Sequence, residues 1–156
     1  MRRFVPVALL LGIFVAGACI SAKDAEPKYK TAEVKQFTKA DGVDLTQDYL
    51  NAAYAHLRDD LQKSKLFGAV VEDGATVADA DAADSVIVQC NVLDFTKAHF
   101  PVIASAHVDV TITRISDHSV LQHTTTKVAW QPNSNDDTKG KLSSAQITAE
   151  IKKLLQ

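Results

Sequence analysis

The longest periodic pattern of apolar residues in the chain runs from Leu45 to Phe67. Apolar residues recur there at helical spacing with polar residues between them, which is typical of a helix that packs on a core by one side. Asp44 followed three residues later by Gln47 is a capping-box pattern, and Gly68 can adopt the left-handed conformation that ends a helix. We predict one long helix over this stretch, with its buried stripe at Leu50, Ala53, Tyr54, Leu57 and Leu61.

Other segments alternate apolar and polar residues with the period of two that β-strands show. Ser85–Lys97 is the strongest of them and predicts a central strand, because it carries an unbroken apolar row. Ala104–Ile115 and Val120–Trp130 alternate as well and are separated by four turn residues, which predicts an antiparallel hairpin. We pair Val108 with Val128 in that hairpin. The apolar row of the central strand consists of Val86, Val88, Cys90 and Val92.

The remaining segments complete the predicted fold. Thr31–Lys39 predicts a first strand, and Ala69–Glu72 predicts a short strand beside the long helix. Gln131–Lys141 reads as a polar loop, followed by a capping box of Ser143 and Gln146 that would begin a short C-terminal helix. We therefore predict a single α+β domain over residues 31–156, with a mostly antiparallel sheet of about four strands, the long helix on one face and the short C-terminal helix beside it.

The N-terminus has the three parts of a secretory signal peptide, which we assign to residues 1–18. A short basic segment, Met1–Arg3, precedes the apolar run Phe4–Val15, and the small residues Ala16, Gly17 and Ala18 follow it. The apolar run is shorter than the about 20 residues that a membrane-spanning helix needs. We therefore expect the chain to be exported.

Two processing routes fit the end of this leader. Ala16 and Ala18 suit general signal peptidase, but Ala16-Gly17-Ala18-Cys19 also resembles the lipobox of bacterial lipoproteins, in which the cysteine is lipidated. Residues 19–30 have the polar composition of a tether, which favours a lipid anchor on Cys19. The alternative is a plain periplasmic or secreted protein. We predict a location in the periplasm or, as a lipoprotein, at the outer membrane of a bacterium.

Composition narrows the function classes further. The chain has 156 residues, 46% of them hydrophobic, and a formal net charge of −2 that includes the two arginines of the leader. This charge predicts no binding to nucleic acid, and contact with a membrane only through the lipid. Cys90 lies in the middle of an apolar row and is expected to be a core residue. The acidic segment Ala75–Asp84 lacks the glycine and the distal glutamate of a calcium loop.

The candidate chemistry is sparse. His107 and Asp109 lie on the polar side of the predicted hairpin, with Lys127 and His123 across from them, and an enzyme would use His107 as a general base oriented by Asp109. The simpler interpretation is an exposed sheet face with cross-strand charge pairs. The sequence has no phosphate-binding glycine loop and no zinc-ligand spacing, so we predict no catalytic residues, no metal and no cofactor.

A resemblance to a known family rests on the residues that join the predicted helix and strands. The chain from Leu61 to Val71, the segment Ala83–Val88 and the segment Ala106–Thr113 resemble a family of uncharacterised bacterial envelope lipoproteins. The single domain of that family is related in fold to the periplasmic domain of the curli-secretion channel lipoprotein. The resemblance implies an accessory or assembly protein of the envelope, and it brings no catalytic residues.

These observations lead to two hypotheses about function. The first is a non-enzymatic envelope protein that acts through contacts with other envelope proteins. The second is a periplasmic protein that binds a small ligand between helix and sheet, with Phe100, His107 and Trp130 as possible ligand-binding residues.

Overall fold

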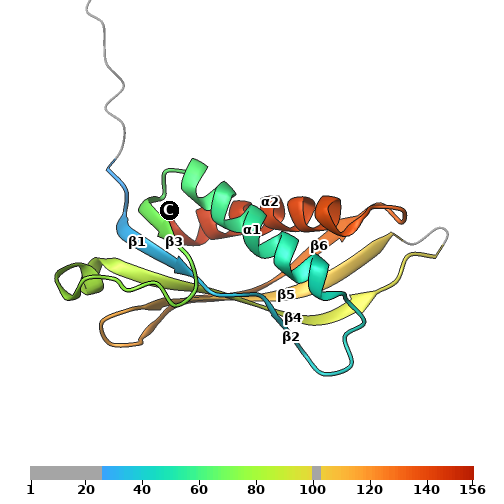
Figure 1. The fold of residues 1–156 in the computed structure, drawn as a ribbon, viewed down its shortest axis with the longest axis horizontal. Coiled ribbons are helices and arrows are strands. Elements are labelled where there is room, and N and C mark those ends of the chain that lie inside the picture. The colour runs from blue at the N-terminus through green and yellow to red at the C-terminus, as the bar shows by residue number, and fades with distance from the viewer. Residues whose placement is uncertain (1–25, 100–102) are drawn as a thin grey trace, which may run out of the picture.

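The computed structural model describes residues 26–99 and 103–156, which form two layers: a twisted sheet with both long helices on one face (Figure 1). The predicted signal peptide, Cys19 and Phe100 lie outside the described residues. No helix among the described residues is both long and apolar enough to cross a membrane. The elements in chain order are β1 (Tyr29–Val34), β2 (Thr38–Lys39), α1 (Gln47–Lys63), β3 (Phe67–Val71), the short 3₁₀ helix η1 (Asp79–Asp84), β4 (Ser85–Thr96), β5 (Ala104–Arg114), β6 (Val120–Trp130) and α2 (Asp136–Leu155).

The sheet has six strands and mixes parallel with antiparallel pairs, which corrects the predicted four-stranded, mostly antiparallel sheet. Its order is β3-β1-β4-β5-β6, with β2 beside β4 further along that strand. β1 is parallel to both β3 and β4, and β2 is parallel to β4, whereas β4, β5 and β6 run antiparallel. The parallel pairs arise because α1 carries the chain from β1 back to the start of β3, a crossover connection. Residues 31–39, predicted as one strand, contribute to both β1 and β2.

The β5–β6 hairpin forms where predicted, but its register differs by two residues. Ala106 lies opposite Val128, whereas the predicted partner of Val128 was Val108. A shift of two leaves every side chain on its predicted face, because the side-chain period of a strand is two. The shift reflects a turn in which His118 takes a positive φ of 56° and a register irregularity that leaves Leu121 unpaired. Neither feature has a signature in the sequence.

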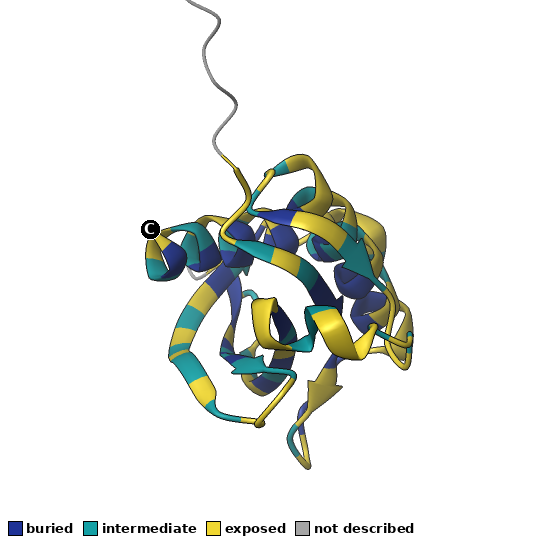
Figure 2. Ribbon diagram, turned by 90° about the vertical axis from the view of Figure 1, so that its left-hand side faces the viewer, coloured by how far each residue is buried: buried dark blue, intermediate teal, exposed yellow. Residues whose placement is uncertain are grey.

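The core lies between the helices and the covered face of the sheet, where Figure 2 shows the buried positions in dark blue. The predicted apolar row of β4 is buried, and burial raises the pKa of the Cys90 thiol, so this cysteine is a core residue as predicted. A bulge between Val92 and Asp94 reverses the alternation of β4 beyond it. Phe95 therefore joins the core side and stacks on Trp130, with ring centroids 6.0 Å apart.

α1 buries the predicted stripe, but both of its ends differ from the prediction. Its N-cap is Thr46, whose hydroxyl accepts a hydrogen bond from the backbone N–H of Tyr49. Asp44, the predicted cap, forms an ion pair with Lys97 instead. The left-handed residue after the helix is Lys65, with a φ of 58°. Gly68 belongs to β3, where a Cβ would lie 2.8 Å from the carbonyl oxygen of Lys30.

α2 is a helix of 20 residues that begins after Asn135, so the predicted loop 131–141 and short helix are corrected. The predicted capping-box residue Ser143 is buried in the helix, and its hydroxyl lies 3.0 Å from that of Tyr49. Burial raises the pKa of Tyr49 to about 12. Gly140 suggested a loop in the sequence, but it lies where α2 crosses α1. A Cβ on Gly140 would lie only 2.7 Å from the backbone nitrogen of Ala53.

We expect Gly140→Ala to lower the free energy of unfolding by about 1–3 kcal/mol, because the added methyl forces two backbones apart. Alanine is the better helix former by about 1 kcal/mol, so its propensity alone predicts the opposite sign. Urea denaturation of the two proteins measures the difference. The matched control is Lys141→Ala, an exposed substitution one residue later in α2. A Gly140→Ala protein that is more stable than the parent contradicts the tight crossing.

Candidate functional site on the helix-free face of the sheet

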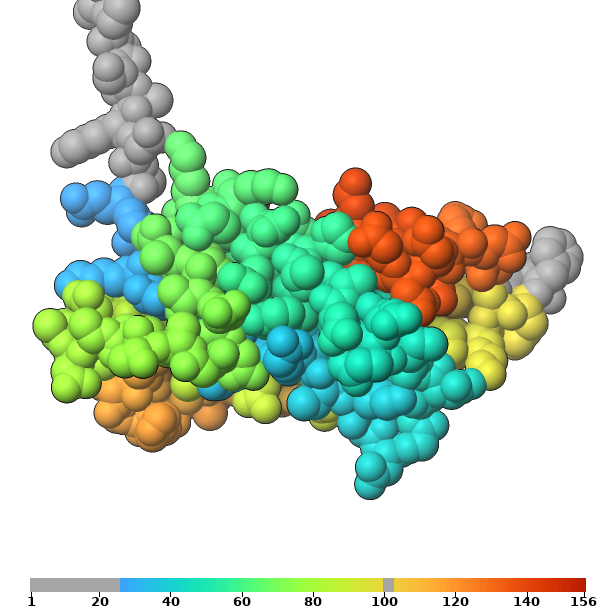
Figure 3. Space-filling model, viewed as in Figure 1, coloured from blue at the N-terminus to red at the C-terminus, as the bar shows by residue number. Residues whose placement is uncertain are grey.

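The face of the sheet that carries no helix contains a polar hollow of about 470 Å³. The chain at β2 and the turn after it projects below the body of the molecule, where Figure 3 shows it in cyan, and forms one wall. The floor consists of two cross-strand pairs from β4 and β5, Gln89 opposite Thr111 and Asn91 opposite Asp109. Sheet alternation explains the polar floor, because the residues between these on each strand point into the core.

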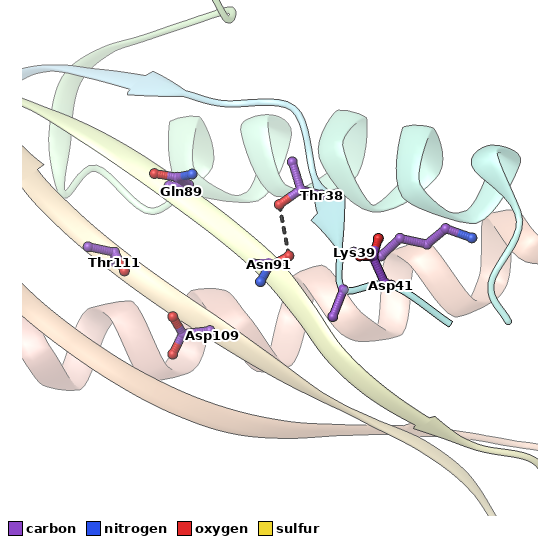
Figure 4. A pocket seen from close by; sticks show the side chains of 8 residues that line it. Thr38, Lys39, Asp41, Gln89, Asn91, Asp109 and Thr111 are labelled. Atoms are coloured by element: carbon purple, nitrogen blue, oxygen red, sulfur yellow. Dashed lines mark hydrogen bonds between the residues drawn. The ribbon is translucent and has the colours of Figure 1, made fainter. Parts of the chain in front are cut away.

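Hydrogen bonds fix two of these floor residues, Asn91 and Asp109, and Figure 4 shows the bond to Asn91. The hydroxyl of Thr38 donates to Oδ1 of Asn91 at 2.9 Å, so the amide of Asn91 is oriented and its NH₂ group stays available as a donor. Asp109 accepts from the hydroxyl of Thr125 at 3.2 Å, and its Oδ1 lies 2.7 Å from Nε2 of His123. The hollow therefore presents amide, hydroxyl and carboxylate groups whose directions are set by the sheet.

The charge of the hollow is negative at its rim and floor. Asp41 and Asp109 line it, whereas the ammonium of Lys39 points away and donates to the carbonyl oxygens of Val43 and Leu45 at 3.0 and 2.6 Å. A neutral or positively charged polar molecule suits such a surface better than an anion does.

The two acid–base candidates from the sequence belong to different pairs. Nδ1 of His107 lies 2.9 Å from both carboxylate oxygens of Asp94, and the backbone N–H of His107 donates to the same carboxylate at 3.1 Å. Asp109, the predicted partner of His107, pairs with His123 as described. The bulge of β4 sets this choice, because it aims Asp94 at the next strand. The side-chain bond from His107, followed by its backbone N–H, lowers the pKa of Asp94.

The three possible ligand-binding residues do not form one site among the described residues. Trp130 is 3% exposed and packs in the core against Tyr49, with ring centroids 5.4 Å apart. His107 is exposed on the opposite, helix-free face of the sheet. Phe100 lies outside the described residues. Trp130 therefore fills the space between helix and sheet in which we expected a ligand.

The sequence pattern did not predict the hollow. Gln89 and Asn91 gave a signal, since two amides at alternate positions interrupt the outer side of an otherwise apolar strand. The wall at Thr38 gave none, because it depends on the split of one predicted strand into two. No three His, Cys, Asp or Glu residues in the described ranges gather in a way that would hold a metal ion.

Comparisons with known proteins identify the fold. No family model matches the chain, and no curated protein matches its sequence. The PelC dodecamer of Paraburkholderia phytofirmans is similar in structure, with a TM-score of 0.57 and 13% sequence identity over 83% of this chain and 89% of that chain. A Xanthomonas campestris protein described under the family model DUF330 has a TM-score of 0.55 and 14% identity over 85% of both chains. At these identities the similarity shows a shared fold and no specific family.

The pairing of His107 with Asp94 predicts a carboxyl pKa below the ordinary value of about 3.9. Because the pKa of Asp94 is lower in the folded chain, this contact stabilises the folded chain at pH values above the ordinary pKa of about 3.9. The stabilisation is lost as the pH falls through the folded-state pKa. Titration of the Asp94 carboxyl carbon by NMR measures it. We expect His107→Gln to raise the midpoint, and Asp109→Asn, the control, to leave it in place. An equal response to both substitutions contradicts the separation of the two pairs.

Proposed function

We propose that this chain is an exported protein of the bacterial envelope, anchored by lipid on Cys19, that works by binding other envelope proteins and not by catalysis. The three-part leader and the polar segment after it support export and anchoring. The observation that carries the binding role is the arrangement of the helix-free face. It is open, polar and built on rigid strands, which suits recognition of a partner surface.

The charge pairs on that face support a role without catalysis. A general base needs a partner that orients it and a reacting group within hydrogen-bond reach. His107 has an orienting partner in Asp94, but the pair joins β5 to β4 on the exposed face of the sheet and lines none of the hollow. Asp109 has both of its contacts on β6, and these contacts fix the carboxylate as part of the sheet surface.

The shared fold supports a role in assembly for this domain. PelC, described as a dodecamer, is similar in fold over 83% of this chain. For the present chain we propose assembly with envelope proteins, which is also what the resemblance to envelope lipoprotein domains implies.

The intact mass of the protein from its host tests export and anchoring together. We expect a chain that begins at Cys19 and carries the added mass of acyl groups, and a Cys19→Ser variant that lacks them. A chain that begins at Cys19 or a few residues later without added mass supports export but removes the anchor. A cytoplasmic protein that keeps Met1 contradicts the proposal.

A second candidate function is the binding of a small polar ligand in the hollow, which its volume and the oriented amide of Asn91 favour. Native mass spectrometry of the protein purified from its host should then show a bound small molecule. We expect Gln89→Leu to lose that mass, because it replaces a floor amide with an apolar group. Lys127→Ala, which changes the same face outside the lining of the hollow, should keep it. The absence of any added mass in the parent protein contradicts this function.

A further inference from the structure

The outer edge of β6 is closed at one end by a side chain of α2. The side-chain amide of Gln146 accepts from the backbone N–H of Ala129 at 3.3 Å and donates to the backbone carbonyl of Ala129 at 3.2 Å. These are the two bonds that a neighbouring antiparallel strand would make at that position. They also show that the N–H and C=O of Ala129 point away from β5.

The outward direction of these backbone groups recurs at every second residue along β6. If Ala129 points outward, so do the backbone groups of Lys127, Thr125 and His123, since every second residue of a strand faces the same neighbour. No described residue bonds to these outward groups. At the other end the irregularity at Leu121 interrupts the ladder. The open part of the edge, which we call the β6 window, therefore runs from residue 123 to residue 127.

The two edges of the sheet differ in this respect. At the β3 edge, the N–H of Val70 donates to Oε1 of Gln62 on α1 at 3.0 Å, so a helix side chain covers that short strand at Val70. α2 closes only one end of β6, because it crosses the sheet towards β1, where the ammonium of Lys28 donates to the carbonyl of Leu155 at 2.6 Å. An edge strand with unpaired backbone groups is a template for another strand.

We propose that the β6 window binds the β6 window of a second copy of this chain, in antiparallel register about a two-fold axis at Thr125. Thr125 then lies opposite Thr125 of the second copy, and His123 lies opposite Lys127. All outward backbone groups of the three residues gain partners. The irregular end of one strand meets the end that Gln146 closes on the other, so the window matches itself.

The charges that face each other in this register also match. The ammonium of Lys127 meets His123, whose Nε2 lies 2.7 Å from the Asp109 carboxylate, so a negative charge offsets it.

This homodimer is independent of the proposed function, since an anchored or a free domain would form it alike. Pairing over five residues covers a small area, so we expect a dissociation constant of micromolar order, not nanomolar. Sedimentation velocity from about 1 µM to about 500 µM should show a monomer–dimer equilibrium. A monomer throughout this range overturns the proposal.

Two substitutions at Thr125 test which surface carries the association. Thr125→Pro removes an outward N–H, which an edge strand tolerates, and we expect it to weaken the dimer roughly tenfold or more. Thr125→Val keeps the N–H and the β-branched shape but loses the hydroxyl bond to Asp109, as the proline variant does. It should dimerise like the parent. Equal dimerisation of the proline variant and the parent overturns the proposal.

Cysteine cross-linking tests the register and does not depend on the proline variant folding. In the full chain with Cys19→Ser, Thr125→Cys should form a disulfide-linked dimer on mild oxidation, since opposed residues of a hydrogen-bonded pair have Cα atoms about 5.5 Å apart. Lys127→Cys on the same face should not, because its copies lie about 14 Å apart along the strands. Cys90 is buried and does not compete. Equal cross-linking of both variants, or none in either, overturns the register.

Discussion

The close crossing of α1 and α2 is the contact on which the rest of the structure depends. One helix covers only part of a six-stranded sheet, and the apolar side chains of β4, β5 and β6 need a second helix above them. Gly140 allows that helix to lie against the backbone at Ala52 and Ala53. The buried hydroxyls of Tyr49 and Ser143 then meet across the same interface, which satisfies both polar groups.

Placing both helices on one face dictates the character of the other. The side chains that alternate away from the core have no layer above them, so they remain hydrated and polar. Their carboxylates find partners within the sheet: Asp94 pairs with His107, and Asp109 pairs with His123. The hollow follows from the same constraint, because the chain between β1 and α1 must pass along the edge of β4 before it reaches the covered face.

The sequence predicted those parts of the fold that depend on local pattern. The stripe of α1, the apolar row of β4 and both faces of the hairpin are periodic over many residues, and burial enforces that period. The predictions were wrong where the structure depends on a contact between segments that are distant in the sequence. Gly140 has the composition of a loop but the role of a helix crossing, and the parallel pairs of β1 depend on where α1 returns the chain. The pairing of His107 was missed because it depends on one extra residue in β4.

Each of the two helices also bonds to an edge strand of the sheet through one glutamine. Gln62 on α1 and Gln146 on α2 each point down from the helix layer and bond to an edge strand, at β3 and at β6. One glutamine reaches about one residue of strand, so Gln62 meets the five-residue β3 at Val70, whereas Gln146 leaves the β6 window open in a strand of eleven residues. Covering the whole β6 edge would require α2 to run along it, and α2 instead crosses towards β1 to cover the core. The crossing that completes the core therefore leaves the β6 window exposed.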